Sequence, residues 1–491
     1  MGARWPPFLN QYLGEDKLRR TKIVATLGPA TDDLKVLESL VVAGVDVVRL
    51  NFSHGSFEEQ KFRADNIRKF AEKHGKAIGV LVDLQGPKIR TCKFKEGKVN
   101  LVEGDSFILD AALGDLDGTN ERVGLTYKQL PDDVQPGNTL LLDDGRMILQ
   151  VTDVKGQEVH TKVMHTGPLS NNKGINLQGG GLSAPALTEK DKRDIISAAQ
   201  LEADFVAVSF PRTADDVNEC RALLRKAGGH GAIVSKIERA EAMDVIDEII
   251  EASEVIMVAR GDLGVEVGDA ELPAIQKDLI KRARAMDRVV ITATQMMESM
   301  IENPIPTRAE VFDVANAVLD GTDAVMLSGE TAAGKYPAKV VEAMGRICEE
   351  AEKQRSSRVS DHRVDLTFGR SDEAIAMATM YTANHLDVDG IAALTESGST
   401  PLWMSRISSG LPIYALTRSE QTKRRMTLYR GVYPMSINID DVKQYQLSAH
   451  AQKVLLARGV VKNDDLIIIT KGDKVGVDGG TNSMKIVRIG A

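Results

Sequence analysis

The chain has 491 residues, and at about 150 residues per domain this length predicts roughly three domains rather than one compact core. Hydrophobic residues make up 43% of the chain and aromatic residues only 4%, which is typical of an α/β protein with aliphatic cores. Lys and Arg number 62 against 70 Asp and Glu, so the net charge of -8 argues against nucleic acid or an anionic membrane as the main partner.

The three cysteines and the N-terminal residues indicate in which cellular compartment the protein works. Cys92, Cys220 and Cys348 lie far apart and match neither a disulfide framework nor a metal-binding spacing. The N-terminal segment, 1–20, lacks the apolar stretch of a signal peptide, and no apolar run reaches the roughly 18 residues that a membrane span needs. We therefore expect a cytoplasmic protein that keeps its thiols reduced.

Eight short apolar runs rich in β-branched residues follow in chain order, and most are too short to be helices. They cover 23–27, 45–50, 78–83, 205–210, 233–237, 255–259, 289–293 and 324–327. Amphipathic stretches follow most of them, for example 34–43, 56–74, 188–201 and 272–286. Eight β/α units predict a closed (β/α)8 barrel, and in that fold functional residues lie at the carboxyl ends of the strands.

One interval breaks this rhythm. More than a hundred residues separate the third run from the fourth, and region 86–170 contains short alternating segments with turn signals such as Pro136-Gly137-Asn138. We expect a small all-β domain there, inserted between barrel parts 21–85 and 171–347. Because it leaves the barrel beside a strand end, it could act as a lid that excludes water. An insertion with no part in the function is the alternative.

The last part of the chain, 348–491, begins with a basic stretch and then alternates again. A helix is expected at 372–386, and strands are expected at 390–395, 411–416, 431–435, 465–470 and 485–489. This order predicts a separate C-terminal open α/β domain.

Charged residues end two neighbouring runs of the predicted barrel. Lys236 and Glu238 stand two positions apart and project to the same side of an extended strand, and Asp262 follows the next strand. One ammonium and two carboxylates at one place can hold a divalent metal and keep a cation beside phosphate charge. A salt bridge at the mouth of the barrel is the simpler reading.

The second run ends in a face that could bind an oxyanion. Arg49, Asn51 and Ser53 share this face, and Arg is well suited to a bidentate grip on phosphate. On its own such a strand end is more often a structural hydrogen-bond network. Asp83 closes the third run and Thr294 the seventh, so polar residues gather at several strand ends.

Several unusual segments in this order resemble the pyruvate kinase family. They are TLGPA at 26–30, RLNFSHG at 49–55, DLQGPKIRT at 83–91, KGINL at 173–177, SKIE at 235–238, VARGDLGVE at 258–266, TATQMMESM at 292–300, the long segment 306–337 and TESGST at 395–400. The resemblance runs from about residue 20 into the C-terminal domain. It implies the same three-domain architecture and phosphoryl transfer from phosphoenolpyruvate to ADP, giving pyruvate and ATP.

The resemblance also implies roles for individual residues. Arg49 would grip the phosphoryl group, Glu238 and Asp262 would bind Mg²⁺, with Mn²⁺ as an alternative, and the ammonium of Lys236 would stabilise the transition state. Backbone N–H groups at Gly261 and Asp262, with the Thr294 hydroxyl, would receive the substrate carboxylate, and a water near Thr294 would protonate the enolate. Four residues would contact or lie near the nucleotide: Asn51, His54, Arg90 and Lys173. For His54 a structural role is an equal alternative.

This chain departs from potassium-dependent members of the family after Asp83. Those members usually place Thr next and Glu four residues beyond it, where this chain has Leu84 and Lys88. The ammonium of Lys88 could replace the charge of K⁺ near Asn51, Ser53 and Asp83, so we predict activity without added potassium. A surface lysine at the lid hinge is the alternative.

The C-terminal domain carries a second candidate site. A phosphate could bind to the hydroxyls and N–H groups of the loop formed by Thr395, Ser397, Gly398, Ser399 and Thr400, where a strand leads into a predicted helix at 401–408. An ordinary strand-to-helix cap is the alternative reading. The family uses this loop for a phosphorylated effector, and fructose bisphosphate, hexose or pentose monophosphates and AMP all remain open.

Two other functions remain to be weighed. A Mg²⁺-dependent lyase acting on pyruvate or oxaloacetate would need neither the lid nor Lys236, and a catalytically silent sensor of phosphorylated metabolites would not need Arg49, Lys236, Glu238 and Asp262 intact. Pyruvate formation with and without ADP separates the three. The family resemblance implies a homotetramer, on which the sequence itself is silent.

Overall fold

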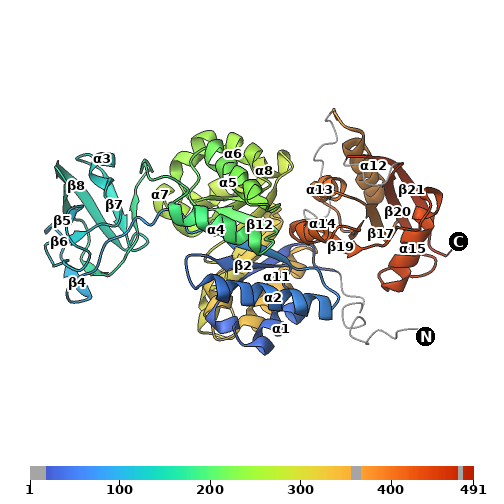
Figure 1. Cartoon of the computed structure of the whole chain (residues 1–491), viewed down its shortest axis with the longest axis horizontal. Coiled ribbons are helices and arrows are strands. Elements are labelled where there is room, and N and C mark those ends of the chain that lie inside the picture. The colour runs from blue at the N-terminus through green and yellow to red at the C-terminus, as the bar shows by residue number, and fades with distance from the viewer. Residues whose placement is uncertain (1–17, 355–366, 474–478, 491) are drawn as a thin grey trace.

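The computed structural model describes residues 18–354, 367–473 and 479–490. Three domains stand in a row, with a β domain and an α/β domain at opposite ends of a central barrel (Figure 1). Most of the predicted N-terminal segment, 1–17, and most of the basic stretch after the barrel, 355–366, lie outside the described residues.

The central domain is a closed barrel of eight parallel strands in the order β1-β16-β15-β14-β13-β12-β3-β2. Its strands are β1 (Lys22–Leu27), β2 (Val47–Asn51), β3 (Gly79–Asp83), β12 (Phe205–Val208), β13 (Ala232–Ile237), β14 (Val255–Ala259), β15 (Val289–Ala293) and β16 (Ala324–Leu327). The predicted (β/α)8 fold is confirmed, and all eight strands coincide with the apolar runs. Such runs are continuous because a parallel strand is buried on both faces.

Helices surround the barrel, and local sequence fixes their ends. The side chain of Asp33 caps α1, Gly44 ends it with a φ of 101°, and Ser56 with Glu59 forms a capping box at the start of α2. The helices are α1 (Leu34–Ala43), α2 (Phe57–Lys73), α4 (Glu189–Gln200), α5 (Ala214–Lys226), α6 (Ile246–Ala252), α7 (Arg260–Val267), α8 (Leu272–Ala285), α9 (Arg308–Asp320), α10 (Gly329–Ala332) and α11 (Pro337–Ala351).

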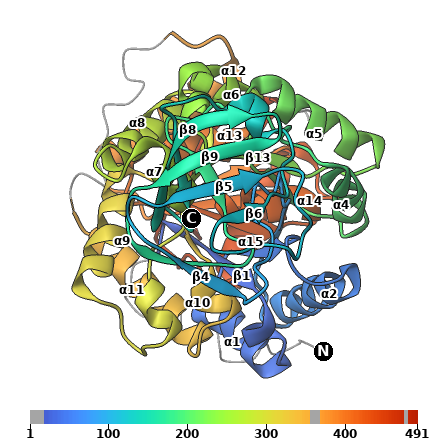
Figure 2. The same cartoon turned by 90° about the vertical axis from the view of Figure 1, so that its left-hand side faces the viewer.

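The inserted domain contains a six-stranded sheet in the order β11-β7-β8-β9-β5-β6 and a two-stranded sheet of β4 and β10. Its elements are β4 (Lys98–Leu101), β5 (Ser106–Asp110), β6 (Arg122–Gly124), α3 (Leu130–Asp133), β7 (Thr139–Leu142), β8 (Met147–Lys155), β9 (Glu158–Val163), β10 (Gly167–Ser170) and β11 (Ile175–Leu177). Because β11 pairs with β7, the sheet extends beyond the expected boundary at residue 170. In the view from this end the sheet lies in front of the barrel (Figure 2).

The C-terminal domain is an open sheet in the order β19-β18-β17-β20-β21 in which only β21 is antiparallel. Its elements are α12 (Ser371–His385), β17 (Gly390–Leu394), α13 (Ser399–Arg406), β18 (Ile413–Thr417), α14 (Glu420–Arg425), β19 (Val432–Ser436), α15 (Leu447–Ala457), β20 (Leu466–Gly472) and β21 (Thr481–Arg488). β21 begins before the predicted residue 485 because its polar first half pairs with the end of β20.

This domain packs against the amino ends of the barrel strands. A continuous apolar cluster joins barrel residues such as Val24 and Phe205 to Met404 and Leu428 of the C-terminal domain, and Lys22 Nζ donates to Val432 O at 2.7 Å. The carboxyl ends of the strands therefore face the lid, at the opposite end. None of the helices in the described parts of the chain is long and apolar enough to cross a membrane.

Candidate active site at the carboxyl ends of the barrel strands

Lys236 and Glu238 lie side by side at the end of β13, as the strand period predicts. Lys236 Nζ lies 2.9 Å from Glu238 Oε1, 3.4 Å from Asp83 Oδ1 and 2.7 Å from Ser209 Oγ. Glu238 Oε2 accepts the N–H of Phe210 at 2.9 Å. One buried ammonium is thus shared by two carboxylates from β3 and β13, both at most 2% exposed.

The charges of this cluster perturb one another. Burial alone would lower the pKa of Lys236, but the carboxylates of Asp83 and Glu238 outweigh it and raise that pKa to about 12. For Glu238 burial dominates and raises the pKa to about 7, with the nearby charge of Asp262 acting in the same direction. Burial also raises the pKa of Asp262. A further cation beside Glu238 and Asp262 would therefore stabilise their ionised forms.

Glu238 and Asp262 suit a hard divalent cation. Mg²⁺ is commonly held by one or two carboxylates, with substrate oxygens and water completing its shell. Across the described residues no group of three or more His, Cys, Asp or Glu side chains could hold a metal by itself. A buried carboxylate, Glu238, and a half-buried one, Asp262, both with raised pKa values, could hold such a cation.

Arg49 is held in position at the end of β2. Its Nε donates to Asp83 Oδ2 at 2.6 Å, and Nη1 donates to Thr26 Oγ1 at 3.1 Å. Burial would raise the pKa of Asp83, but Lys236 and Arg49 outweigh burial and lower it. Asp83 is therefore an anion that fixes two cations, and the guanidinium of Arg49 retains further N–H donors for an oxyanion.

Thr294 follows β15 in a left-handed turn, with a φ of 63°. Its Oγ1 accepts the N–H of Gly261 at 2.8 Å and donates to Ala293 O at 2.7 Å. Asp262 lies in the first turn of the eight-residue helix α7. The start of α7 and the Thr294 hydroxyl are therefore in direct contact.

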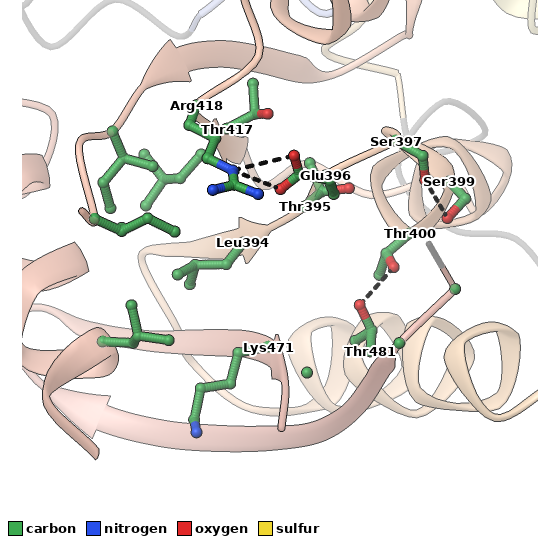
Figure 3. Close-up of a pocket in the computed structure, with 17 residues that line it drawn as sticks. Leu394, Thr395, Glu396, Ser397, Ser399, Thr400, Thr417, Arg418, Lys471 and Thr481 are labelled. Carbon is green, nitrogen blue, oxygen red and sulfur yellow. Dashed lines mark hydrogen bonds and ion pairs between the residues drawn. The ribbon is translucent and has the colours of Figure 1, made fainter. Parts of the chain in front are cut away.

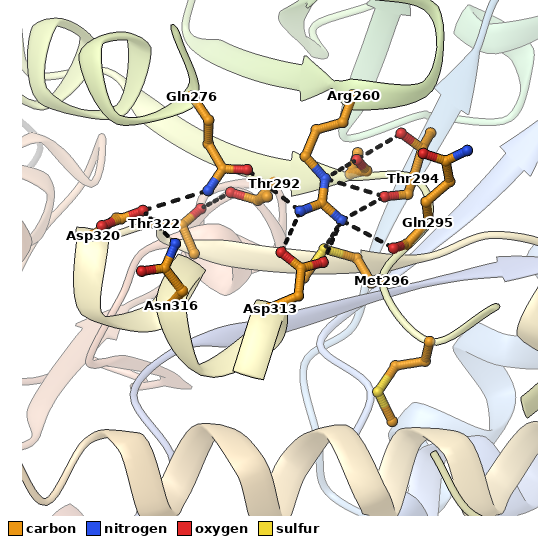
Figure 4. Close-up of polar contacts among 12 residues, drawn as sticks. Arg260, Gln276, Thr292, Thr294, Gln295, Met296, Asp313, Asn316, Asp320 and Thr322 are labelled. Carbon is orange, nitrogen blue, oxygen red and sulfur yellow. Dashed lines mark hydrogen bonds and ion pairs between the residues drawn. The ribbon is translucent and has the colours of Figure 1, made fainter. Parts of the chain in front are cut away.

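A buried arginine that the sequence reading missed holds this turn (Figure 4). The Arg260 guanidinium donates to the carbonyl oxygens of Ala293, Thr294 and Gln295 and forms a two-pronged pair with Asp313 of α9, at 2.7 and 2.8 Å. Arg260 is only 8% exposed. The position of the Thr294 backbone therefore depends on the position of α9. Both residues stand in segments quoted for the resemblance, but nothing in their spacing predicts the contact.

The lid joins the barrel through two adjacent chain segments. Arg90 forms an isolated bridge with Gly174, and Thr91 N donates to Lys173 O at 2.9 Å. Lys173 Nζ lies 2.7 Å from Asp143 Oδ1 of the lid. Arg90 and Lys173 therefore lie together at the hinge and line the same cleft as Lys236 and Glu238.

A further carboxylate joins the hinge to the barrel. Glu266, near the end of α7, accepts Asn176 Nδ2 of β11 at 3.3 Å and Ala240 N at 2.9 Å. Burial raises its pKa to about 7. It lies within the VARGDLGVE segment, but its contact with the lid could not be read from the sequence.

The expected monovalent-cation region lies beside this cleft. Asn51, Ser53, Asp83 and Lys88 all line it, although Lys88 is exposed. Burial, with the charges of Arg90 and Lys190, lowers the pKa of Lys88.

The loop after β2 also meets residues that the sequence did not single out. Lys190 Nζ reaches this loop and donates to Phe52 O at 2.7 Å. His54 is exposed and is not among the residues that line the cleft, while its carbonyl accepts Gln60 Nε2 at 2.8 Å.

The second predicted site forms a pocket in the C-terminal domain (Figure 3). Thr395 Oγ1 accepts the N–H of Gly398 at 2.9 Å, Ser397 Oγ donates to Ser399 Oγ at 3.2 Å, and Thr400 Oγ1 lies 2.9 Å from Thr481 Oγ1. Gly398 needs its lack of a side chain because its φ is 86°. The loop thus brings several hydroxyls to the start of α13.

Cationic residues from neighbouring strands complete this pocket. Arg418 pairs with Glu396, and Lys471 of β20 lines the opposite side. The sequence reading missed both, because they lie 18 and 71 residues beyond the end of the loop along the chain. Only the sheet order, which places β18 and β20 on either side of β17, brings them together.

Comparisons with known proteins agree over nearly the whole chain. A family model described as "Pyruvate kinase, barrel domain" matches residues 18–341, and one described as "Pyruvate kinase, alpha/beta domain" matches 373–487. Pyruvate kinase II of Salmonella typhimurium is 58% identical over 478 residues, covering 96% of this chain and 99% of that protein. A pyruvate kinase of Haemophilus influenzae is 56% identical over 460 residues, covering 93% and 96%. Among solved structures, a pyruvate kinase from Cryptosporidium parvum has a TM-score of 0.88 at 33% identity and covers 96% of both chains.

Proposed function

The chain belongs to the pyruvate kinase family, and from that premise we propose how its own residues divide the reaction. It is a phosphotransferase that moves the phosphoryl group of phosphoenolpyruvate to ADP, giving pyruvate and ATP. The observation that supports our assignment of the site is the convergence of Arg49, Lys236 and Glu238, with Asp262 on the adjoining helix, at the end of the barrel that faces the lid.

Arg49 and Lys236 bind the phosphoryl group from two sides. Arg49 is prevented from turning away by Asp83 and Thr26, so its remaining N–H groups stay directed to the cleft. Lys236 keeps its proton, because its pKa lies near 12. It therefore stabilises transferring negative charge and is not the acid that protonates the enolate.

Glu238 and Asp262 hold Mg²⁺, with Mn²⁺ as an alternative. When bound there, the metal would neutralise charge on the phosphate and on the enolate oxygen as the P–O bond breaks. When no metal is bound, Lys236 is the cation that pairs with Glu238, at 2.9 Å.

The start of α7 receives the substrate carboxylate. The N–H of Gly261, now bonded to Thr294 Oγ1, and that of Asp262 point out of the first turn of the helix, where an anion is favoured. Thr294 then orients a water that protonates the enolate carbon. Arg260 acts only through the turn that it holds, so it is a positioning residue.

The nucleotide binds between the barrel and the lid. Arg90 and Lys173 contact its phosphates from the hinge, and Asn51 and His54 lie on the barrel side. Lys173 now pairs with Asp143, so ADP competes with a lid carboxylate for the same ammonium. Lid movement and nucleotide binding are coupled through this exchange.

The enzyme works without potassium. Buried Leu84 stands where potassium-dependent members usually have Thr, and Lys88 lines the cleft together with Asn51, Ser53 and Asp83. A lysine at this point provides one positive charge near the nucleotide phosphates, which is what a bound K⁺ would add.

A phosphorylated metabolite activates the enzyme at the C-terminal domain. Its phosphate binds the loop of Thr395, Ser397, Gly398, Ser399 and Thr400, where hydroxyls gather at the start of α13. Lys471 adds a cation across the pocket.

Two exposed apolar faces support assembly into a homotetramer. Ile305 and Phe312, beside and on α9, are 71% and 75% exposed, and Tyr381 of α12 and Ile486 of β21 are 54% and 42% exposed. β21 is also the edge strand of its sheet, with unpaired backbone groups. Two separate self-complementary surfaces generate a closed tetramer with dihedral symmetry. We place the enzyme in the cytoplasm, where its three buried thiols stay free.

The deciding experiment measures pyruvate formation from phosphoenolpyruvate with and without ADP, in the presence of Mg²⁺. Turnover that requires ADP and yields ATP supports the proposal. ADP-independent release of pyruvate would identify the barrel as a lyase, and no turnover of the folded protein would identify a sensor. Removal of Mg²⁺ by a chelator should abolish turnover, and Mn²⁺ should restore it.

A further inference from the structure

A second buried cluster of charges lies at the other end of the barrel, at the seam with the C-terminal domain. A small cavity there is lined by three arginines from distant parts of the chain: Arg20 before β1, Arg284 of α8 and Arg430 before β19. Ser405, in the last turn of α13, and Ser408 and Ser409 after it complete its polar lining. Its apolar wall consists of Met380, Ile407, Leu411 and Ile413.

The cations of this seam outnumber the carboxylates that neutralise them. Arg406 pairs with Asp323, and both side chains are fully buried. Arg20 pairs with Glu352 at 3.5 Å. Among the described residues, neither Arg284 nor Arg430 has a carboxylate within ion-pair distance.

Within the described parts of the chain, the side chains of Arg284 and Arg430 bond only to backbone carbonyl groups. Arg284 donates to Gly321 O and Arg406 O, each at 2.7 Å, and Arg430 donates to Val318 O and Thr322 O, each at 3.0 Å. A guanidinium has five N–H donors, so each keeps donors in excess of these bonds. Arg430 is 8% exposed.

A buried charge (Arg430) and a half-buried one (Arg284), neither with a counter-ion within ion-pair distance among the residues that the structure describes, are costly. A buried charge in a protein is normally paired, and an arginine cannot escape the cost by losing its proton. Burial and the neighbouring charge of Arg406 lower the pKa of Arg284 to about 9, and burial lowers that of Arg430. Among the described residues that line the cavity there is no Asp or Glu. Asp323 and Glu352 act on the two guanidiniums only from beyond ion-pair distance, so the described lining of the cavity itself lacks a negative charge.

We propose that the seam cavity binds a small inorganic anion of the size of chloride, held by Arg284 and Arg430. The cavity leaves about 20 Å³ for the centre of a water-sized particle, room for one or two waters. So narrow a space favours a monatomic anion over the four oxygens of phosphate. The apolar wall lowers the local dielectric and strengthens the attraction.

The anion joins the C-terminal domain to the barrel. Arg284 already donates to the carbonyl of Arg406, the last residue of α13, and Arg430 N donates to Asp323 just before β16. An ion that binds both guanidiniums therefore binds the folded seam and not the unfolded chain. It stabilises the folded protein in proportion to its occupancy.

The test follows thermal unfolding of the full chain while chloride replaces gluconate at constant ionic strength and pH. The unfolding midpoint of the wild-type protein should rise saturably, by about 1–2 °C at tenfold the half-saturating concentration. Arg284→Met and Arg430→Met should lose the rise. Arg282→Met should keep it, because Arg282 lies on the same helix but pairs outside the cavity with Asp278. Lys471→Met should also keep it, which separates the seam from the pocket of the C-terminal domain.

The absence of a saturable rise in the wild-type protein, or an equal rise in Arg284→Met, would overturn the proposal. A rise with phosphate but not with chloride would refute the proposal that the bound ion has the size of chloride. If the Met variants do not fold, crystals of the wild-type protein soaked in bromide give a direct answer. An anomalous peak within hydrogen-bond distance of Arg284 and Arg430 supports the site, and a cavity without one refutes it.

Discussion

Asp313→Asn tests whether the buried pair beneath Thr294 positions the active site. The substitution keeps the size of the side chain but removes the charge that faces Arg260 at 2.7 and 2.8 Å. Arg260 would then have only neutral partners, chiefly backbone carbonyl oxygens, with Gln276 and Met296 beside them. Because those carbonyls belong to Ala293, Thr294 and Gln295, any shift of the guanidinium moves the turn that bears the Thr294 hydroxyl.

The magnitude follows from burial. Breaking a fully buried ion pair costs about 3–5 kcal/mol, but the Asp313 side chain is 33% exposed, so we expect about 1–2 kcal/mol. A displacement of the order of 1 Å in a positioned group can cost about 100-fold in rate. We therefore expect kcat to fall about 10- to 100-fold, with a smaller change in KM for ADP, whose proposed contacts lie at the lid hinge and after β2.

The assay pairs steady-state kinetics with denaturant unfolding, each compared with Asp247→Asn. Asp247 also pairs with an arginine, Arg282, but both side chains are largely exposed. The control should lose at most about 0.5 kcal/mol and keep its kcat. If Asp313→Asn loses the expected stability yet keeps kcat within about twofold of wild type, Arg260 supports the fold only and the positioning argument is wrong.

Four further predictions concern single side chains. Lys236→Met should fold normally by circular dichroism but lose about 100- to 1000-fold in kcat, since it removes the charge beside the phosphoryl group; near-normal turnover would refute the role. Wild-type activity should change less than twofold between potassium-free and potassium-containing buffer, and Lys88→Glu should make turnover depend on potassium; a large stimulation of the wild type would contradict this. Ser399→Glu should abolish activation by phosphorylated metabolites through charge repulsion and leave basal kcat unchanged, whereas retained activation would place the effector elsewhere. Burial raises the pKa of Glu266 from 4.5 to about 7, so between these pH values the folded protein holds a proton that the unfolded chain releases. The free energy of unfolding should therefore fall as pH rises from about 4.5 to 7. Urea titrations at the two ends of this range should show that Glu266→Gln removes about 2–3 kcal/mol of the fall.

The fold of the barrel was open to prediction because each strand is specified locally. The run 255–259 is apolar throughout, and as β14 it is buried on both faces. Caps mark the helices between strands, so the repeat of strand and helix could be counted along the chain. The lid boundary was less exact, because β11 is three residues long and is defined only by its pairing with β7.

The site could be predicted where the ends of the strands and the two-residue period of a strand determine which side chains meet. Lys236 and Glu238 meet because they are two residues apart on one strand, and Arg49 and Asp83 meet because β2 and β3 are neighbours. The pair of Arg260 and Asp313 joins a helix start to a helix that lies 53 residues later. Its formation depends on the rotation of α9 about its axis, which no local pattern encodes.

Each end of the barrel holds charged side chains whose ionised form is disfavoured by burial: carboxylates at one end and guanidiniums at the other. At the mouth, burial raises the pKa of Glu238 and Asp262, so the ionised carboxylates call for a cation, which the reaction provides. At the seam, burial lowers the pKa of Arg284 and Arg430, so the guanidiniums call for an anion. The first site lies at strand ends and could be anticipated from spacing. The second is assembled from residues brought together only when the C-terminal domain packs on the barrel, and it becomes visible only when the buried charges of the whole fold are counted against one another.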